Sequence, residues 1–142
     1  MRFWLRIKRL ILGRAEASHL RAGRLGECEA KRHLKQLGLK FLAANFRSKR
    51  GEIDLVFRDG QSLVFVEVKT RSPDAWERPA AAVDREKRRR LSRAAIDYLR
   101  LLPDPQICIR FDIVEVILEG SRVREVRHLP NCFPLSQPYR LG

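Results

Sequence analysis

Charged side chains interrupt an otherwise apolar segment between residues 51 and 71. Asp59 and Gly60 in its middle form a preferred two-residue turn, so the segment predicts a β-hairpin. A turn at this point sets Glu52 directly opposite Glu67. Because side chains alternate between the two faces of a strand, one face carries Glu52, Asp54, Glu67 and Lys69.

This arrangement is unfavourable unless something binds to it. Glu52 opposite Glu67 places like charges about 5 Å apart at the Cβ atoms, which destabilises a sheet. Asp54 lies diagonally from Glu67, so a divalent cation held by both carboxylates would relieve the repulsion. Lys69, one pleat beyond Glu67, is placed to hold and polarise a water molecule. Such a set is typical of metal-dependent phosphodiesterases, whereas the competing interpretation is a solvated face with mixed charges.

The composition favours one folded domain with an anionic partner. A chain of 142 residues with 44% hydrophobic residues is long enough to bury a core. It carries 30 lysines and arginines against 17 acids, a net charge of +13. Nucleic acid is the first candidate partner, because the abundant arginines bind phosphate in a bidentate manner, and an anionic membrane surface is the second.

Cysteine and histidine offer no alternative chemistry. The three cysteines lie far apart without a Cys-x-x-Cys pair, which predicts a reducing, cytoplasmic compartment and no zinc site. The three histidines are equally scattered, so neither a Ser-His-Asp nor a Cys-His arrangement is supported. These residues are Cys28, Cys108, Cys132, His19, His33 and His128.

The elements that must position the charged residues follow from periodicity and turn signals. The predicted order is a helix over 26–37, a strand over 39–47, the hairpin over 51–71, a loop over 72–79, a helix over 84–102, and strands over 107–118 and 122–129. The segment from Pro130 predicts a loose or surface-wrapping tail. Neither an internal repeat nor a long linker divides the chain.

Each predicted helix carries a charged residue on its apolar stripe. Glu27 lies on the apolar stripe of the first helix, where it either favours the helix dipole or reaches into a site beneath the helix. Lys87 lies one turn before Leu91 on the buried stripe of the second helix, so it can aim into the same cleft. Phosphate is a natural counter-ion for the cations around it, which are Arg85, Arg88, Arg89 and Arg90.

The first residues mix cations with bulky apolar side chains. Arg6, Lys8 and Arg9 interrupt the apolar run, so a secretory signal is not expected, and no segment is long enough to span a membrane. We expect residues 1–22 to form a basic amphipathic extension that packs on the domain. Binding of this extension to a membrane surface is the alternative.

Several blocks of the sequence carry a family resemblance. They are Gly26-Glu27, Gly51-Glu52-Ile53-Asp54-Leu55, Phe65-Val66-Glu67-Val68-Lys69-Thr70-Arg71, Ala82-Val83, Lys87, Leu91, Arg110-Phe111-Asp112, His128, Asn131 and Phe133. Together they resemble the restriction-endonuclease-like fold and, more closely, the bacterial YraN family of predicted nucleases akin to archaeal Holliday-junction resolvases. The resemblance covers a nuclease-like domain over residues 23–133 and leaves 134–142 as a C-terminal tail.

The resemblance implies a single α/β domain, with a restriction-endonuclease-like core whose central mixed β-sheet is flanked by helices. It also implies that Mg²⁺ or Mn²⁺ supports hydrolysis of phosphodiester bonds in DNA. The implied catalytic residues are Glu27, Asp54, Glu67 and Lys69. The implied metal ligands are Asp54, Glu67, Glu27 and the Val68 carbonyl. Glu52 is implied as an acid that lies next to these ligands without binding the metal itself. The implied phosphate contacts are Arg50, Arg71, Lys87 and Arg88.

Other functions stay open at this point. A nucleic-acid-binding module could keep the nuclease fold without significant catalysis, although retention of the four implied catalytic residues argues against it. A membrane-surface accessory protein that uses the basic extension is a further alternative, and membrane binding is not our expectation. Related resolvases act as dimers, so a homodimer is among the expected partners, but the sequence identifies no dimer face.

Overall fold

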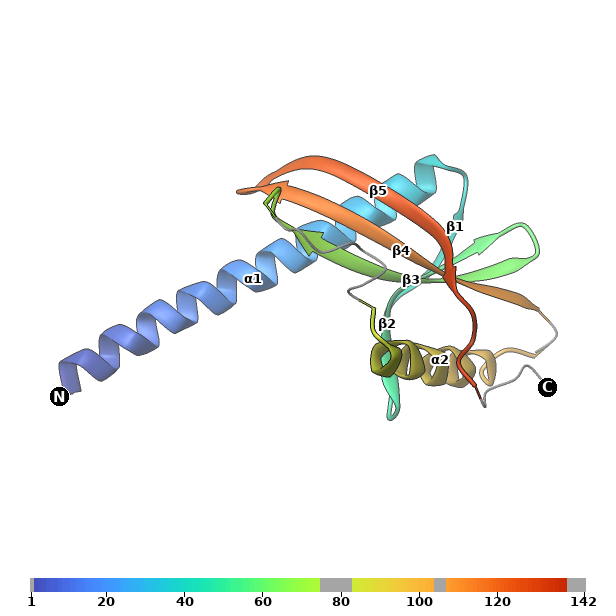
Figure 1. The fold of residues 1–142 in the computed structure, drawn as a ribbon, viewed down its shortest axis with the longest axis horizontal. Helices are drawn as coiled ribbons and strands as arrows, with labels where there is room; N and C mark the ends of the chain where they lie inside the picture. The colour runs from blue at the N-terminus through green and yellow to red at the C-terminus, as the bar shows by residue number, and fades with distance from the viewer. Residues whose placement is uncertain (1, 75–82, 104–106, 138–142) are drawn as a thin grey trace.

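The computed structural model describes residues 2–74, 83–103 and 107–137, with the side chains of the first helix described from Ala17 onward. The elements are α1 (Arg2–Gln36), β1 (Lys40–Ser48), β2 (Gly51–Asp59), β3 (Ser62–Arg71), α2 (Arg85–Leu99), β4 (Cys108–Glu119) and β5 (Arg122–Phe133) (Figure 1). The expected extension, loop and tail lie partly outside the described residues, at residue 1, residues 75–79 and residues 138–142.

The five strands form one sheet in sequence order. β3 and β4 run parallel, while the other neighbouring strands are antiparallel, so the sheet is mixed. A parallel pair needs a crossover connection, and α2 lies in the crossover from β3 to β4. The predicted α/β class, with a central mixed sheet flanked by helices, is confirmed.

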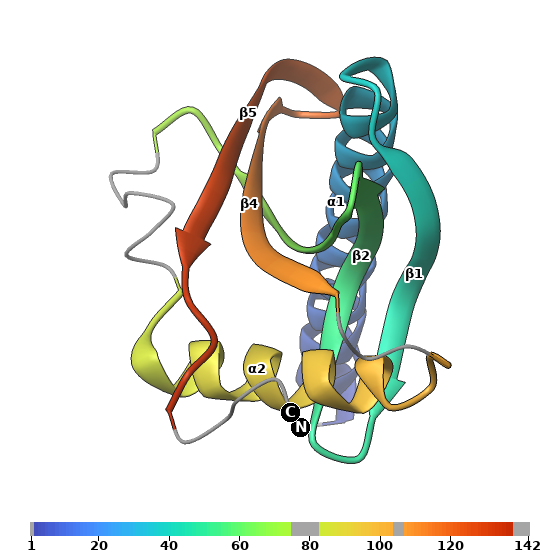
Figure 2. The same cartoon turned by 90° about the vertical axis from the view of Figure 1, so that its right-hand side faces the viewer.

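The two helices cover opposite faces of the sheet (Figures 1 and 2). The buried apolar residues of the α1 face are Ala30, Leu34, Leu39, Leu55, Phe57, Val64, Val66, Val114, Val116 and Leu118. Those of the α2 face are Ile53, Val56, Leu63, Phe65, Val83, Leu91, Ala94, Ala95, Leu99, Phe111, Ile113 and Phe133. Both faces of the central strands are therefore apolar, as burial on two sides requires.

α1 is one continuous helix, whereas the sequence predicted a separate extension followed by a helix from Gly26. It passes without a break through the boundary expected at residues 22 and 23, and its first half projects beyond the sheet (Figure 1). It ends as predicted at Gly38, whose φ is +92°. The N–H groups of Gly38 and Leu39 donate to the carbonyls of Lys35 and Leu34, a Schellman end that satisfies two helix carbonyls.

The predicted hairpin forms, but its register differs by two residues from the prediction. Asp59 pairs with Ser62, so the turn is centred on Gly60–Gln61. The required positive φ, +56°, falls on the glycine. The predicted opposition of Glu52 and Glu67 is therefore wrong. A shift of two residues does not by itself move a side chain to the other face, because the side-chain period of a strand is two.

Residues 130–136 are more regular and better packed than the sequence predicted. Residues 130–133, expected to begin a loose tail, continue β5. Leu135 packs against the core on the α2 face. The backbone N–H of Ser136 donates to the hydroxyl of Ser92 on α2, at 2.9 Å. These contacts fasten the end of β5 to the second helix.

Candidate active site

β2 and β3 separate beyond Leu55 and Val66, the last pair of their ladder. Asp54 lies at the point of separation. Its Oδ2 accepts a hydrogen bond of 2.8 Å from the backbone N–H of Val68, so a side chain takes the place of a strand partner. Ile53 packs on the α2 face, whereas Leu55, two residues along the same strand, packs on the α1 face. The strand alternation therefore breaks at Asp54.

β1 is irregular at the same level. Its pairs with β2 include Phe46 with Ile53 and Ala44 with Leu55, and Asn45 lies between them with a φ of +52°. Asparagine adopts this left-handed conformation more readily than most residues. The irregularity on both strands releases the carboxylate between them from the regular ladder and allows it to reach β3.

The pKa of Asp54 is raised to about 7. Burial is the largest cause, because it disfavours the charged carboxylate, and the negative charges of Glu67 and Glu27 act in the same direction. The hydrogen bond from Val68 and the positive charge of Lys87 act in the opposite direction. Acids from α1 and β3 and a lysine from α2 therefore influence the carboxylate of Asp54, as groups within one functional site do.

Glu67 is buried on the α2 face of β3 and lies between two lysines. Its Oε1 is 3.4 Å from Nζ of Lys69 and 3.3 Å from Nζ of Lys87. The glutamate side chain is only 6% exposed, so its charge needs compensation, which the two ammonium groups supply. One lysine comes from β3 and the other from the start of α2, so the strand and the helix meet at this carboxylate.

Glu27 approaches the site from α1. The preceding residue, Gly26, lies directly on β3, because a Cβ atom there would be 2.0 Å from Oγ1 of Thr70. Since α1 begins at Arg2, Glu27 is far from a helix N-terminus, and the helix-dipole interpretation does not apply. The half-buried side chain instead acts electrostatically on Asp54.

The acids suit a hard cation whose remaining ligands are water molecules or substrate oxygens. Within the described residues, no three acid, histidine or cysteine side chains lie close enough to bind a metal by themselves. Asp54, Glu67 and the carbonyl of Val68 offer oxygen donors alone, which suit Mg²⁺ or Mn²⁺ better than zinc. Mg²⁺ commonly takes one or two carboxylates and completes its shell with water and phosphate. The donor set therefore fits a cation bound together with its substrate.

Two predicted site residues have other partners. Glu52 is exposed and pairs with Arg47 of β1 at 3.5 Å, so the structure does not bring it to Glu67. Arg50 donates to Asp97 of α2 in hydrogen bonds of 3.2 and 2.5 Å, which tie the β1–β2 turn to the helix. A phosphate contact by Arg50 stays a prediction.

The other two predicted phosphate contacts differ in their surroundings. Nε of Arg88 donates to the carbonyl of Val83 at 3.0 Å, and its guanidinium lies 5.3 Å from the ring centre of Phe133. Arg88 therefore also supports the start of α2. Arg71 is half-buried at the end of β3, three residues beyond Val68.

A buried ionic network escaped the sequence analysis. Asp112 is fully buried and accepts hydrogen bonds from the guanidinium of Arg110 and from the backbone N–H of Asn131, while Nε2 of His128 lies 2.7 Å from its Oδ2. Burial alone would raise the pKa of Asp112, but these partners hold it below the ordinary value. His128 pairs in register with Val114 of the α1-face core, so the network lies across the sheet from Glu67.

Glu115 was missed as well. It pairs in register with Lys69 on one side and with Arg127 on the other. Its Oε1 is 3.9 Å from Nη1 of Arg127, and its buried Oε2 has no hydrogen-bond partner in the described part of the chain. The signal was an acid inside the apolar run from 113 to 118, which marks a carboxylate beneath the surface.

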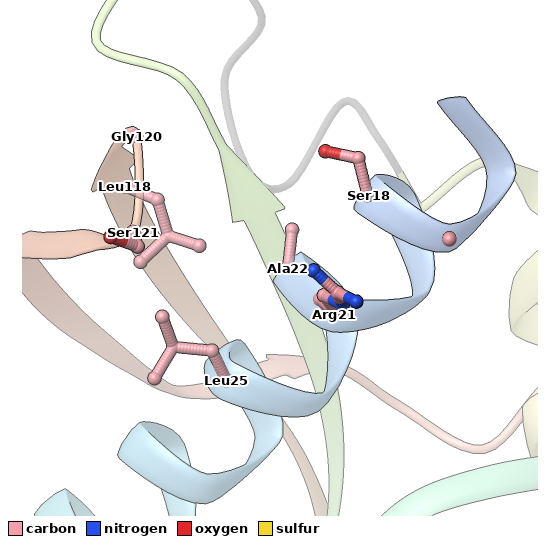
Figure 3. Close-up of a pocket in the computed structure, with 8 residues that line it drawn as sticks. Ser18, Arg21, Ala22, Leu25, Leu118, Gly120 and Ser121 are labelled. Carbon is pink, nitrogen blue, oxygen red and sulfur yellow. The ribbon is translucent and has the colours of Figure 1, made fainter. Parts of the chain in front are cut away.

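A further hollow lies away from the acids. A groove of about 590 Å³ separates α1 from the β4–β5 turn, and its lining is Ala17, Ser18, Arg21, Ala22, Leu25, Leu118, Gly120 and Ser121 (Figure 3). Its side chains are small or apolar apart from one arginine, so it offers no chemistry of its own. Within the described residues, no helix has both the length and the apolar character needed to cross a bilayer.

The mixed sheet, the two covering helices and the acids at the point of strand separation define an α/β protein, consistent with a restriction-endonuclease-like core. The model of the uncharacterised protein family UPF0102 matches residues 26–116, and the chain belongs to this family, the YraN family that the sequence indicated. The matched range contains Glu27, Asp54, Glu67 and Lys69.

Similar proteins share this domain over most of their length. A UPF0102 protein of Geobacter metallireducens is 40% identical over 114 residues, which are 80% of this chain and 93% of that protein. One from Chlorobaculum tepidum is 42% identical over 116 residues, 78% of this chain and 90% of that protein. One from Solibacter usitatus is 50% identical over 101 residues, 70% of this chain and 76% of that protein.

Proposed function

We propose that this protein is a metal-dependent, resolvase-like DNA endonuclease that hydrolyses phosphodiester bonds. The observation that carries the proposal is the meeting of Asp54, Glu67 and Lys69 where β2 and β3 separate. There burial and the charge of Glu67 raise the pKa of Asp54 to about 7. Buried acids beside lysines provide oxygen ligands for a hard cation and positive charge for a phosphate diester.

Each residue has a role in this proposal. Asp54 and Glu67 would hold Mg²⁺ or Mn²⁺, with Glu27 and the Val68 carbonyl as further oxygen donors. When bound, the cation supplies Lewis-acid chemistry to the phosphate and lowers the pKa of water. Lys69 would orient the attacking water and offset the charge that develops on the phosphate. Lys87, which faces the same glutamate, would hold the phosphate.

Single-turnover cleavage of linear and branched duplexes with Mn²⁺, beside a binding titration in Ca²⁺, tests this function. We expect the wild type to cut and Lys69→Ala to lose about 10² to 10⁴ in rate, the usual effect of removing an acid–base group. Its DNA affinity should stay nearly unchanged, because one phosphate contact among several contributes little. Lys40→Ala, in β1 and in register with Arg58 at the far end of β2, is the matched control.

Two outcomes would refute the proposed enzymatic function. If the wild type and Lys69→Ala cut at the same rate, the activity arises from another site or from a contaminant. If the wild type binds DNA but cuts neither duplex, the protein is a nucleic-acid-binding module that has kept a nuclease fold.

A further inference from the structure

A polar groove of about 490 Å³ lies between the β1–β2 turn and the first turns of α2. Residues 48–52 line one side, and Lys87, Arg90 and Leu91 line the other. Lys87 belongs to this groove and to the candidate active site, because its ammonium lies 3.3 Å from Oε1 of Glu67. The groove therefore leads from the surface to the buried acids.

The turn that forms one wall is fixed before any ligand binds. The guanidinium of Arg50 pairs with Asp97 of α2, and the backbone N–H of Arg50 donates to Oγ of Ser48 at 3.2 Å. Gly51 lies so close to α2 that a Cβ atom there would be 2.5 Å from the carbonyl oxygen of Arg90. A preformed groove binds its ligand without a further cost of ordering the chain.

Uncompensated positive charge gathers at the outer end of this groove. Its lining contains four cations and one acid, but Asp97 compensates Arg50, and Arg47 compensates Glu52. Lys49 and Arg90 are exposed, and among the described residues neither pairs with an acid. Two cations therefore remain at the mouth, with Lys87 at the inner end.

We propose that this groove binds the phosphodiester backbone of one nucleic-acid strand, next to the phosphate that faces Glu67. Lys49 and Arg90 would contact the outer phosphates, and Lys87 would contact the phosphate nearest the acids. Ammonium and guanidinium groups along a polar groove select a repeating anion and read no base sequence. The inference rests on the proposed function in one respect only, namely that the phosphate contacted by Lys87 is the one that is cleaved.

Backbone neutralisation tests the groove directly. DNA binding would be titrated in Ca²⁺ with duplexes that carry one neutral methylphosphonate at successive positions. The wild type should lose affinity at one or two neighbouring positions. The double variant Lys49→Gln with Arg90→Gln should bind more weakly and be insensitive at the same positions. Its slope of log affinity against log salt should be smaller by about two, because each lost phosphate contact removes about 0.9.

The matched control is Lys40→Gln with Arg58→Gln. It also removes one exposed lysine and one exposed arginine. Lys40 of β1 and Arg58 of β2 are register partners at the end of β2 that lies far from Gly51. This control should keep the positional pattern and the salt slope of the wild type. Urea unfolding of both double variants would establish that each is folded under the binding conditions.

Two results would refute the proposed binding of a nucleic-acid strand in this groove. Equal weakening by both double variants would mean that binding follows net charge alone. A groove variant that still responds to the same neutral positions would mean that the strand lies elsewhere. The binding titrations do not depend on catalysis. A wild type that shows the expected binding pattern but never cuts DNA would therefore support the proposed binding groove and refute the proposed nuclease activity.

Discussion

The ammonium of Lys87 lies 3.3 Å from Oε1 of Glu67 and joins the basic start of α2 to an acid buried in β3. The N-cap fixes the turn that carries this lysine, since Oδ1 of Asp84 accepts a 2.8 Å hydrogen bond from the backbone N–H of Lys87. A cation in the first helical turn opposes the helix dipole. The carboxylate of Glu67 offsets that opposition, so the ion pair helps to specify where α2 begins relative to the sheet.

Lys87→Ala should weaken DNA binding and reduce the slope of log affinity against log salt by about 0.9, the value for one lost phosphate contact. The measurement is a series of DNA titrations between low and physiological salt. Lys87 is a cleaner probe than Arg88, because Arg88→Ala also removes the bond to Val83 and the contact with Phe133. An unchanged slope would show that Lys87 serves Glu67 alone.

Asp54→Asn should strongly weaken Mn²⁺ binding measured by calorimetry, because it removes one of the two carboxylates that fit the cation. A pKa of about 7 means that a proton competes with the metal for Asp54. Wild-type affinity should therefore rise about tenfold per pH unit below pH 7, with release of a proton, and level off above it. Asp59→Asn, in the same strand at the far end of the hairpin, should bind Mn²⁺ like the wild type.

Asp54 should also make the fold less stable as the pH rises. Its folded pKa lies above the ordinary value of 3.8, so the stability that the neutral form contributes is present below pH 3.8 and is lost as the pH rises towards 7. Asp54→Asn stays neutral throughout. In metal-free urea unfolding the variant should therefore gain stability relative to the wild type between pH 4 and pH 7.5. A difference that stays constant over this range would contradict the raised pKa.

Gly26→Ala should destabilise the protein although alanine favours helices. The new Cβ atom would meet Oγ1 of Thr70 at 2.0 Å, so the threonine or the helix has to move. In a Thr70→Ala background the hydroxyl is absent and the nearest remaining atom is the Cβ of residue 70 at 3.3 Å, so Gly26→Ala should cost much less there. Urea unfolding of the four proteins gives the coupling between the two positions, and additive effects would refute the contact.

Asp112→Asn should cost about 3 to 5 kcal/mol of unfolding free energy, because Arg110 and His128 lose a buried ionic partner. The pKa of Asp112 is lowered, so its contribution is present above pH 3.8 and is lost as the pH falls through the folded value. The destabilisation should shrink in acid. Asp59→Asn, which removes the exposed partner of Arg110, should cost about 1 kcal/mol or less.

The common face of Glu67 and Lys69 was predictable from the sequence because the side chains of a strand repeat every two residues. Choosing Asp59-Gly60 as the turn shifted the hairpin by two residues, yet Glu67 and Lys69 kept a common face. The error affected only direct partners, and so Glu52 was wrongly set against Glu67. Turn propensity cannot distinguish neighbouring two-residue turns when one glycine can supply the positive φ for either.

The buried network around Asp112 was beyond sequence reasoning for a different reason. Arg110 and Asp112 lie on β4, while His128 and Asn131 come from β5, where the register against β4 shifts between Phe111 and Ile113. Asn131 adopts a φ of +51° and turns its N–H to the carboxylate. An irregular pairing of two strands leaves no periodic signal, so these residues appeared only as isolated matches to a family.

The close approach at Gly26 determines how near α1 lies to β3 beside the candidate site. Because Gly26 has no side chain, the α1 backbone lies nearer to Thr70 than a larger residue would allow. In the proposed enzyme, rotation about the side-chain bonds of Glu27 would therefore adjust its carboxylate to ions or substrates of different size, while Gly26 keeps the helix close to β3.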